Sequence, residues 1–207
     1  MNQPILTIIT RHMVNKRRVV FKRMLESIAC MGGRIQHLIV NDDKEIGHKY
    51  ISNLVIANRN KAIGKYIWFL DDDDVCTCPQ LPEIIGRIDT CVNPDLIMTR
   101  SMIYHQGIFP LDAYWKKDIG VYPIKAVSIM TPIVKREIFV KAIQNIQGHT
   151  HQIDTFYFIG IQAIHRLKPL KVYYLDYVIG WQPLKLSTRG EKITDDIDNY
   201  IHFGVKV

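Results

Sequence analysis

Short apolar runs alternate with amphipathic stretches along the first third of the chain. Residues 5–10 (ILTIIT), 37–40 (HLIV) and 66–70 (YIWFL) are largely apolar, which is typical of strands buried on both faces. Between these runs, residues 17–31 and 46–63 place apolar side chains three or four positions apart, which predicts two amphipathic helices. This order of strands and helices favours a parallel sheet with helical crossovers, so we expect an α/β fold.

The rest of the chain alternates less regularly. The expected elements are helices at 81–88, 135–146 and 152–166 and strands at 95–100, 127–134 and 170–181. Residues 101–124 are rich in aromatic residues, glycine and proline, which favours an irregular loop or hairpin.

Polar residues follow each of the first three predicted strands: Thr10-Arg11-His12, Asn41-Asp42-Asp43 and Asp71 to Asp74. Ligands bind beyond the carboxyl ends of strands in open α/β sheets, so these three ends should lie side by side. Two carboxylates about 4 Å apart repel each other by roughly 4 kcal/mol at an effective dielectric of 20. A nearby cation would relieve this repulsion, and carboxylate oxygens suit Mg²⁺ or Mn²⁺. The alternatives are a capping role for the aspartates or four solvated loop charges.

Composition narrows the class of protein. The chain has 207 residues, of which 47% are hydrophobic and 23% charged; this favours a folded globular protein over a disordered one. No apolar run reaches the roughly 20 residues of a membrane span. The basic residues follow the first apolar run, whereas in a secretory signal they precede it. We therefore expect a cytoplasmic protein, with its four cysteines as reduced thiols.

The net charge of +7 has two interpretations. It is either a solvated basic surface or a sign of an anionic partner, such as a nucleotide, an acidic glycan or a membrane face. Four aspartates at one strand end would repel the phosphates of a nucleic acid. We therefore expect no nucleic-acid partner and no membrane span, while peripheral contact with a membrane stays open.

The segment GKYIWFLDDDDV, residues 64–75, resembles the G-x-Y-I-x-F-L-D-x-D-D segment of family 2 glycosyltransferases with the GT-A fold. The segments ILTIIT with RMLESI, HLIVNDD, and SIMTPIVKREIFVKA are similar to other segments of that family, in the same order. The resemblance implies a Rossmann-like three-layer α/β/α sandwich with a mostly parallel central sheet. It implies one GT-A domain over residues 1–207, made of a nucleotide-sugar-binding half (1–100), an acceptor-binding and catalytic half (101–184) and a C-terminal tail (185–207).

The resemblance also implies roles for single residues. Asp42 would bind the uracil, Asp71 or Asp72 the ribose, and Asp73 the metal ion, while Asp74 would cap the next segment. The metal, Mn²⁺ or Mg²⁺, would hold both phosphates of a UDP-sugar. Further candidates for donor binding are Thr10, Arg11 and Asn53. Arg11 is chemically attractive because a guanidinium can stack on a base or pair with a phosphate.

Asp154 matches the aspartate of the Glu-Asp pair that opens a helix in this family, with Ile153 in place of the glutamate. It would deprotonate the acceptor hydroxyl in an inverting transfer; alternatively it is a charge that stabilises the helix dipole. The donor sugar would be a hexose or a uronic acid, and the acceptor a glycan, a lipid-linked molecule or a small molecule. Two other functions stay open: a sugar-nucleotide pyrophosphorylase-like nucleotidyltransferase and a non-catalytic nucleotide- or glycan-binding protein. A pyrophosphorylase would normally carry a glycine-rich loop after the first strand, and TRHMVNKRR has no glycine.

Overall fold

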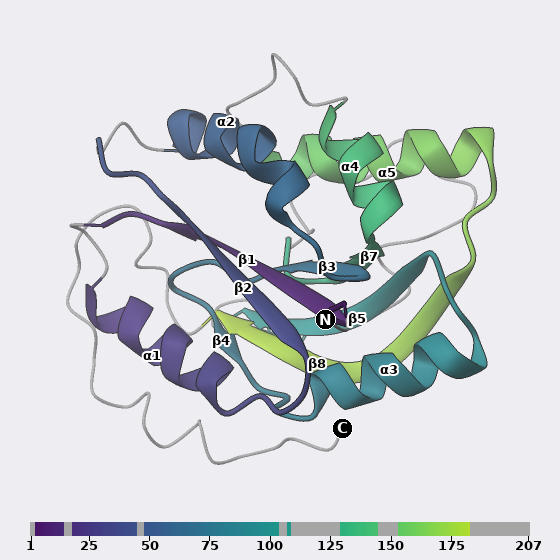
Figure 1. Ribbon diagram of the computed structural model, residues 1–207, viewed down its shortest axis with the longest axis horizontal. Coiled ribbons are helices and arrows are strands. Elements are labelled where there is room, and N and C mark those ends of the chain that lie inside the picture. Colours follow the sequence, from purple (N-terminus) through teal and green to yellow (C-terminus); the bar gives the residue numbers. More distant parts are fainter. Residues whose placement is uncertain are drawn as a thin grey trace.

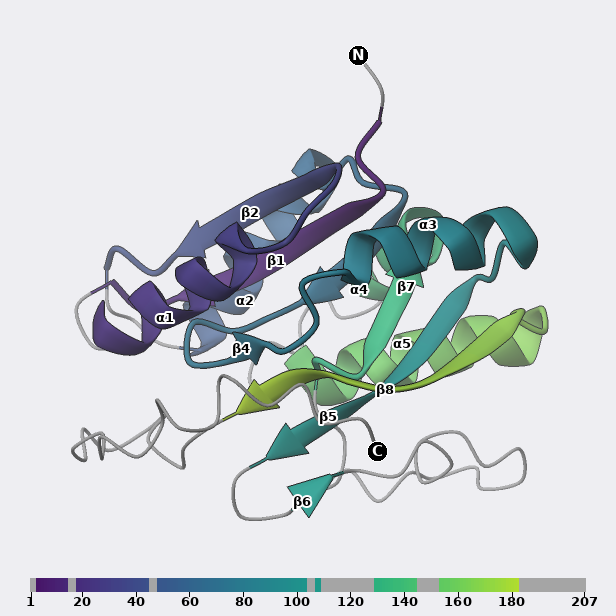
Figure 2. The ribbon, with the colours of Figure 1, turned by 90° about the horizontal axis from the view of Figure 1, so that it is seen from below.

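The chain forms one central sheet covered by helices on both faces (Figures 1 and 2). The structure is a computed structural model that describes residues 3–14, 18–44, 48–103, 107–108, 129–144 and 153–182. The expected Rossmann-like α/β/α architecture is confirmed.

The element bounds are close to the sequence pattern. The strands are β1 (Leu6–His12), β2 (Ile35–Asn41), β3 (Tyr66–Phe69), β4 (Val75–Cys76), β5 (Leu96–Ile103), β6 (Gly107–Ile108), β7 (Pro132–Lys135) and β8 (Val172–Gln182). The helices are α1 (Arg18–Ala29), α2 (His48–Asn58), the 3₁₀ helix η1 (Arg59–Lys61), α3 (Leu81–Cys91), α4 (Arg136–Gln144) and α5 (Ile153–Leu167).

The strand order is β2-β1-β3-β7-β5-β8-β4, and β6 pairs with β5. The strands β1, β2, β3, β5 and β8 run in one direction, while β4 and β7 run against them. These five strands therefore begin at one edge of the sheet, called the amino edge below, and end at the opposite carboxyl edge. In Figure 2 the amino edge lies to the right and the carboxyl edge to the left.

The register between β1 and β3 is constant. Every pair from Leu6↔Tyr66 to Ile9↔Phe69 joins residues 60 positions apart. Past the last ladder pair, the same offset puts Arg11 at the level of Asp71 and His12 at the level of Asp72. The ends of β1 and β3 are thus aligned before any side chain is considered.

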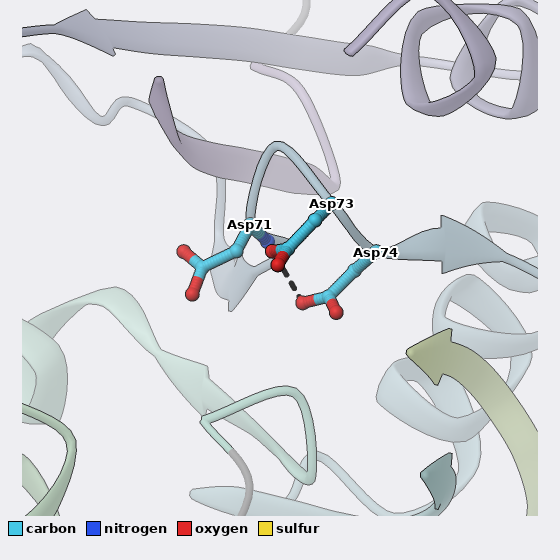
Figure 3. Close-up of side chains that lie close together, drawn as sticks. All are labelled: Asp71, Asp73 and Asp74. Atoms are coloured by element: carbon cyan, nitrogen blue, oxygen red, sulfur yellow. Dashed lines mark hydrogen bonds between the residues drawn. The ribbon is translucent and has the colours of Figure 1, made fainter. Parts of the chain in front are cut away.

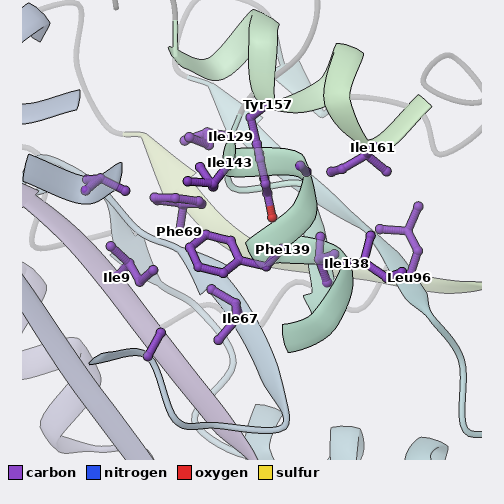
Figure 4. Packing of buried hydrophobic residues seen from close by; sticks show 14 of the residues in the cluster. Ile9, Ile67, Phe69, Leu96, Ile129, Ile138, Phe139, Ile143, Tyr157 and Ile161 are labelled. Carbon is purple, nitrogen blue, oxygen red and sulfur yellow. The ribbon is translucent and has the colours of Figure 1, made fainter. Parts of the chain in front are cut away.

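The helices α2, α4 and α5 cover one face of the sheet (Figure 1). At the centre of this layer Phe69 packs against Tyr157 with ring centroids 5.3 Å apart, and against Phe139 at 6.0 Å (Figure 4). Gly160 lets α5 approach α4 closely, because a Cβ atom at this position would lie 2.8 Å from the carbonyl oxygen of Ala142. This close packing fixes α5 against the sheet.

The helices α1 and α3 cover the opposite face. Met24 of α1 and Ile85 of α3 are fully buried against Trp68 and its neighbours in the sheet. The indole Nε1–H of Trp68 donates a hydrogen bond to the carbonyl of Met130 at 2.8 Å, so the one polar atom of this large side chain is satisfied.

Several elements differ from the sequence expectation. The helix expected at 46–63 ends at Asn58 and is followed by η1, and the strand expected at 95–100 continues to Ile103. The first strand continues through Arg11 and His12, because both residues still pair with β2. The strand expected at 127–134 begins only at Pro132, after a turn at residues 129–130. Strand β4 was not expected, since two residues are too short for a periodic signal; it forms by pairing with β8. Among the described helices, none combines the length and hydrophobicity that crossing a bilayer requires.

Candidate functional site

Arg11, at the end of β1, neutralises the first of the four aspartates. Its Nε donates to Oδ1 of Asp71 at 2.7 Å, and its Nη2 donates to Oδ2 of the same carboxylate. The Arg11 side chain is 9% exposed, so this two-point contact is largely shielded from water. Bidentate pairing of this kind fixes the orientation of both groups.

His12 contacts the second aspartate through one ring nitrogen. Its Nδ1 lies 3.1 Å from Oδ2 of Asp72, and the backbone N–H of Met13 donates to that oxygen at 2.9 Å. Asp72 is completely buried. The ring of Phe21 stacks on the imidazole with centroids 3.6 Å apart, which fixes the plane of the His12 ring. The end of β1 therefore supplies the partners of the first two aspartates.

Asp73 and Asp74 complete the turn and are buried as well. The backbone N–H of Asp71 donates to Oδ2 of Asp74 at 3.1 Å (Figure 3). The N–H of Asp74 donates to the carbonyl of Asp71. The expected role of Asp74 as a cap of the next segment is wrong, because its carboxylate closes the turn back onto Asp71. The other oxygen of Asp74, Oδ1, is buried and has no hydrogen-bond partner among the residues that the structure describes.

Electrostatics at this turn favour a positive ligand. Burial, followed by the negative charges of Asp73 and Asp71, raises the pKa of Asp74 well above its usual range. One ligand atom from each of these three carboxylates lies within 4.8 Å of the other two (Figure 3). Within the described ranges this is the one such group of three or more histidine, cysteine or acidic side chains. Oxygen ligands converging at this spacing fit a hard divalent cation.

Thr10 supports the turn from inside the sheet. Its hydroxyl donates to the carbonyl of Leu70 at 2.8 Å and lies 2.9 Å from Nε2 of His37. Because the hydroxyl proton goes to Leu70, the imidazole N–H of His37 donates to the threonine oxygen. Burial lowers the pKa of His37 to about 4, which keeps this ring neutral near pH 7. Thr10 is completely buried, and its expected contact with the UDP-sugar stays a prediction.

Asp42 lies at the end of β2, next to the end of β1. Its backbone N–H donates to the carbonyl of His12 at 2.8 Å, and the residue is completely buried, whereas Asp43 is exposed. The three polar strand ends therefore lie side by side, as expected. Asn53 is exposed on α2, and its role in donor binding stays a prediction.

Asp154 is the second residue of α5, as expected for a residue that opens a helix. The structure does not describe its side chain. The end of α5 leads into β8 at the amino edge, and 15 residues of helix span about 22 Å. The helix therefore begins towards the carboxyl edge, where the aspartates lie (Figure 2).

Sequence reasoning missed the part played by His12 and Phe21. The usable signal was the spacing of the two strands, because a register that aligns Ile9 with Phe69 also aligns His12 with Asp72. Choosing that register requires the pairing itself. A stacking contact between the end of a strand and the following helix has no periodic pattern that could reveal it.

Comparison with known proteins shows the fold and little else. No protein-family model matches the chain, and no curated protein matches it. Among solved structures, S. aureus TarS shares the fold with a TM-score of 0.61 at 12% identity, covering 87% of this chain and 37% of that one. TarS 1–349 in complex with UDP has a TM-score of 0.60 at 13% identity, and covers 85% of this chain and 59% of that one.

A third structure, TarS 1–349 in complex with UDP-GlcNAc, has a TM-score of 0.59 at 12% identity and covers 85% of this chain. The chain spans only 37% to 59% of the length of these solved structures.

Proposed function

We propose that this chain is a glycosyltransferase that moves a sugar from a UDP-sugar to a hydroxyl acceptor. The observation that carries the proposal is the proximity of Asp71, Asp73 and Asp74 at the carboxyl edge. Solved structures with this fold contain UDP and UDP-GlcNAc. Both facts agree with the resemblance of residues 64–75 to family 2 glycosyltransferases.

The order of the strand ends supports a direction for the donor. Asp42 directly follows β2 and Asp71 follows β3, with β1 between the two strands, so the two backbones are about 10 Å apart at two strand spacings. A uridine diphosphate has its base and its phosphates on opposite sides of the ribose. We assign the uracil to Asp42, whose carboxylate can accept from the base N–H, and the diphosphate to the aspartate turn.

The three carboxylates of the turn would hold a divalent cation, Mn²⁺ or Mg²⁺. Such an ion would neutralise the buried carboxylates and bind the phosphate oxygens of the donor. Asp73 is the ligand implied by the family resemblance, and Asp74 contributes a buried oxygen with no hydrogen-bond partner in the described part of the chain. Arg11 would hold the Asp71 carboxylate in a fixed orientation beside this centre.

The transfer needs a base, and we assign this role to Asp154. Its carboxylate would take the proton of the acceptor hydroxyl while that oxygen forms a bond to C1 of the sugar. The bond from C1 to the phosphate oxygen breaks, and UDP leaves with the bonding electron pair. Attack from the face opposite to UDP would invert the anomeric centre.

Calorimetric titration with UDP tests the donor site. We expect UDP to bind in the presence of Mn²⁺, and we expect Asp73→Asn to weaken this binding by about 100-fold, because the variant loses a charged metal ligand. The control is Glu26→Gln, which removes the charge of a side chain on α1 that is 63% exposed. This variant should bind UDP as tightly as the parent does. UDP affinity that is the same in Asp73→Asn and Glu26→Gln would refute the assignment.

A further inference from the structure

Two large apolar side chains are exposed at the amino edge, opposite the aspartate turn. Leu167, the last residue of α5, is 90% exposed. Ile63, in the turn that leads into β3, is 49% exposed. Both residues precede strands that begin at this edge. At 90% exposure, the Leu167 side chain is in contact with solvent over nearly its whole surface and adds little to the core.

Exposed cations accompany both apolar side chains. Lys61 lies two residues before Ile63, and Lys168 directly follows Leu167. Arg34 precedes β2 and Lys171 precedes β8, so these residues also lie at the amino edge. Among the described residues, the side chains of Arg34, Lys61 and Lys168 form no ion pair.

The partly buried acidic groups of this edge are already neutralised by other lysines. Asp89 pairs with Lys65 at 2.6 Å, and Asp95 lies 3.4 Å from Nζ of Lys135. The remaining acids near this edge, Glu83 and Glu137, are exposed and are outnumbered by the exposed cations named above. The amino edge therefore carries a positive excess, while the carboxyl edge carries the cluster of aspartates.

The amino edge is long enough to lie on a surface. From β2 to β8 there are five strand spacings, which amount to about 24 Å. Arg34 and Lys61 lie near the β2 end of this edge, and Leu167, Lys168 and Lys171 lie near the β8 end. Apolar and basic side chains are thus present near both of its ends.

We infer that the amino edge docks on the surface of an anionic lipid bilayer. Leu167 and Ile63 enter the headgroup region, and the neighbouring lysines and arginine face the lipid phosphates. Phosphates of a nucleic acid would account for the cations but offer no place for two exposed aliphatic side chains. The carboxyl edge is left facing the aqueous phase. This inference does not depend on the proposed enzymatic function.

Sedimentation with lipid vesicles tests the inference. We expect the full chain to bind vesicles of phosphatidylglycerol and phosphatidylcholine, but not vesicles of phosphatidylcholine alone, and to be released by high salt. The double variant Lys61→Glu/Lys168→Glu should lower binding by roughly 30-fold or more, since each lost cation costs about fivefold. Leu167→Ser should lower it by roughly tenfold, because the apolar side chain no longer enters the bilayer.

Lys22→Glu is the matched control. Lys22 is 79% exposed on α1. Lys22→Glu makes the same change of charge as each single substitution of the double variant, near the start of that helix and away from the amino edge. Each variant should keep the unfolding temperature of the parent, since all four side chains are exposed. The inference fails if no vesicle binds, if neutral vesicles bind equally well, or if the edge variants behave like Lys22→Glu. It also fails if Leu167→Ser binds normally while single-stranded RNA competes for the lysines, because the partner is then a polyanion.

Discussion

The two ends of β3 both carry charged groups, and they are built differently. At its amino end the carboxylate of Asp89 accepts from Lys65 at 2.6 Å and from the hydroxyl of Tyr66 at 2.9 Å. Next to this pair, Asp95 accepts from Nζ of Lys135 and from the backbone N–H of Lys171. Each carboxylate oxygen of these two acids has a donor, and each acid has a lysine.

At the carboxyl end, four consecutive aspartates face one guanidinium and one imidazole. Arg11 binds Asp71 and His12 binds Asp72, while the buried Oδ1 of Asp74 has no hydrogen-bond partner among the described residues. A balanced cluster stabilises the folded chain by itself. A cluster with excess buried charge lowers stability unless a ligand of opposite charge binds. The amino end is therefore balanced within the chain, whereas the carboxyl end keeps an excess of buried carboxylates, which the proposed cation would neutralise.

Arg11→Met should have the largest effect on this comparison. The variant leaves the Asp71 carboxylate beside three others without its guanidinium, and we expect a loss of about 3 kcal/mol in the free energy of unfolding. Mn²⁺ should restore much of this loss, because a divalent cation at the turn replaces the missing charge. Urea unfolding with and without Mn²⁺ measures both effects.

Arg11→Lys is the control, since it keeps the charge but not the two-point contact, and it should lose less stability than Arg11→Met. If Mn²⁺ stabilised the parent and Arg11→Met equally little, the carboxyl end would not be a cation site.

Asp89→Ala should have a smaller effect, of about 1.5 kcal/mol. Lys65 loses its partner but is 39% exposed and can be solvated, and the hydroxyl of Tyr66 keeps the carbonyl of Pro94 at 3.0 Å. Mn²⁺ should not restore this stability, because the amino end has no excess of carboxylates. Urea unfolding in both conditions gives the answer, with Asp89→Asn as the control that retains a hydrogen-bond acceptor. Rescue of Asp89→Ala by Mn²⁺ beyond its effect on the parent would contradict the distinction between the two ends.

Asp74→Asn should have the smallest effect and the opposite sign. The amide oxygen can still accept from the backbone N–H of Asp71, while the repulsion among the buried carboxylates decreases. Without metal we expect a gain of about 1 kcal/mol in stability, together with a smaller rise of the unfolding temperature on addition of Mn²⁺. Calorimetric unfolding measures both. A loss of stability without metal would show that the Asp74 charge is needed for the turn itself.

The sequence predicted the first half of the fold better than the second. The apolar runs that became β1, β2 and β3 are separated by helices of regular period, and each lies within two residues of its expected bounds. The position of β7 between β3 and β5 could not be predicted, because the hydrophobic pattern of a four-residue strand shows neither its direction nor its neighbours. Residues 101–124 were expected to be irregular, and most of them lie outside the described residues.

The candidate site could be predicted by kind of residue but not by contact. The excess of carboxylates after β3 indicated a cation site, and the resemblance of residues 64–75 to a known family indicated Asp73. That Asp74 closes the turn onto Asp71, instead of capping the next segment, depends on backbone geometry within four residues. Arg11 and His12 pair with Asp71 and Asp72 because β1 lies beside β3, 60 positions along the chain. A pattern of neighbouring residues cannot predict such a contact.

The constant offset between β1 and β3 also has an evolutionary consequence. Because of this offset, the residues of two short segments, Thr10-Arg11-His12 and Leu70-Asp71-Asp72, should evolve together. Insertions in the loops between the two segments would not change their alignment, because the pairing of β1 with β3 from Leu6↔Tyr66 onwards sets it. A substitution that changes the charge of a residue in one segment, however, removes the partner of a buried charged side chain in the other segment. In related sequences, we therefore expect these two segments to change together or to be conserved together.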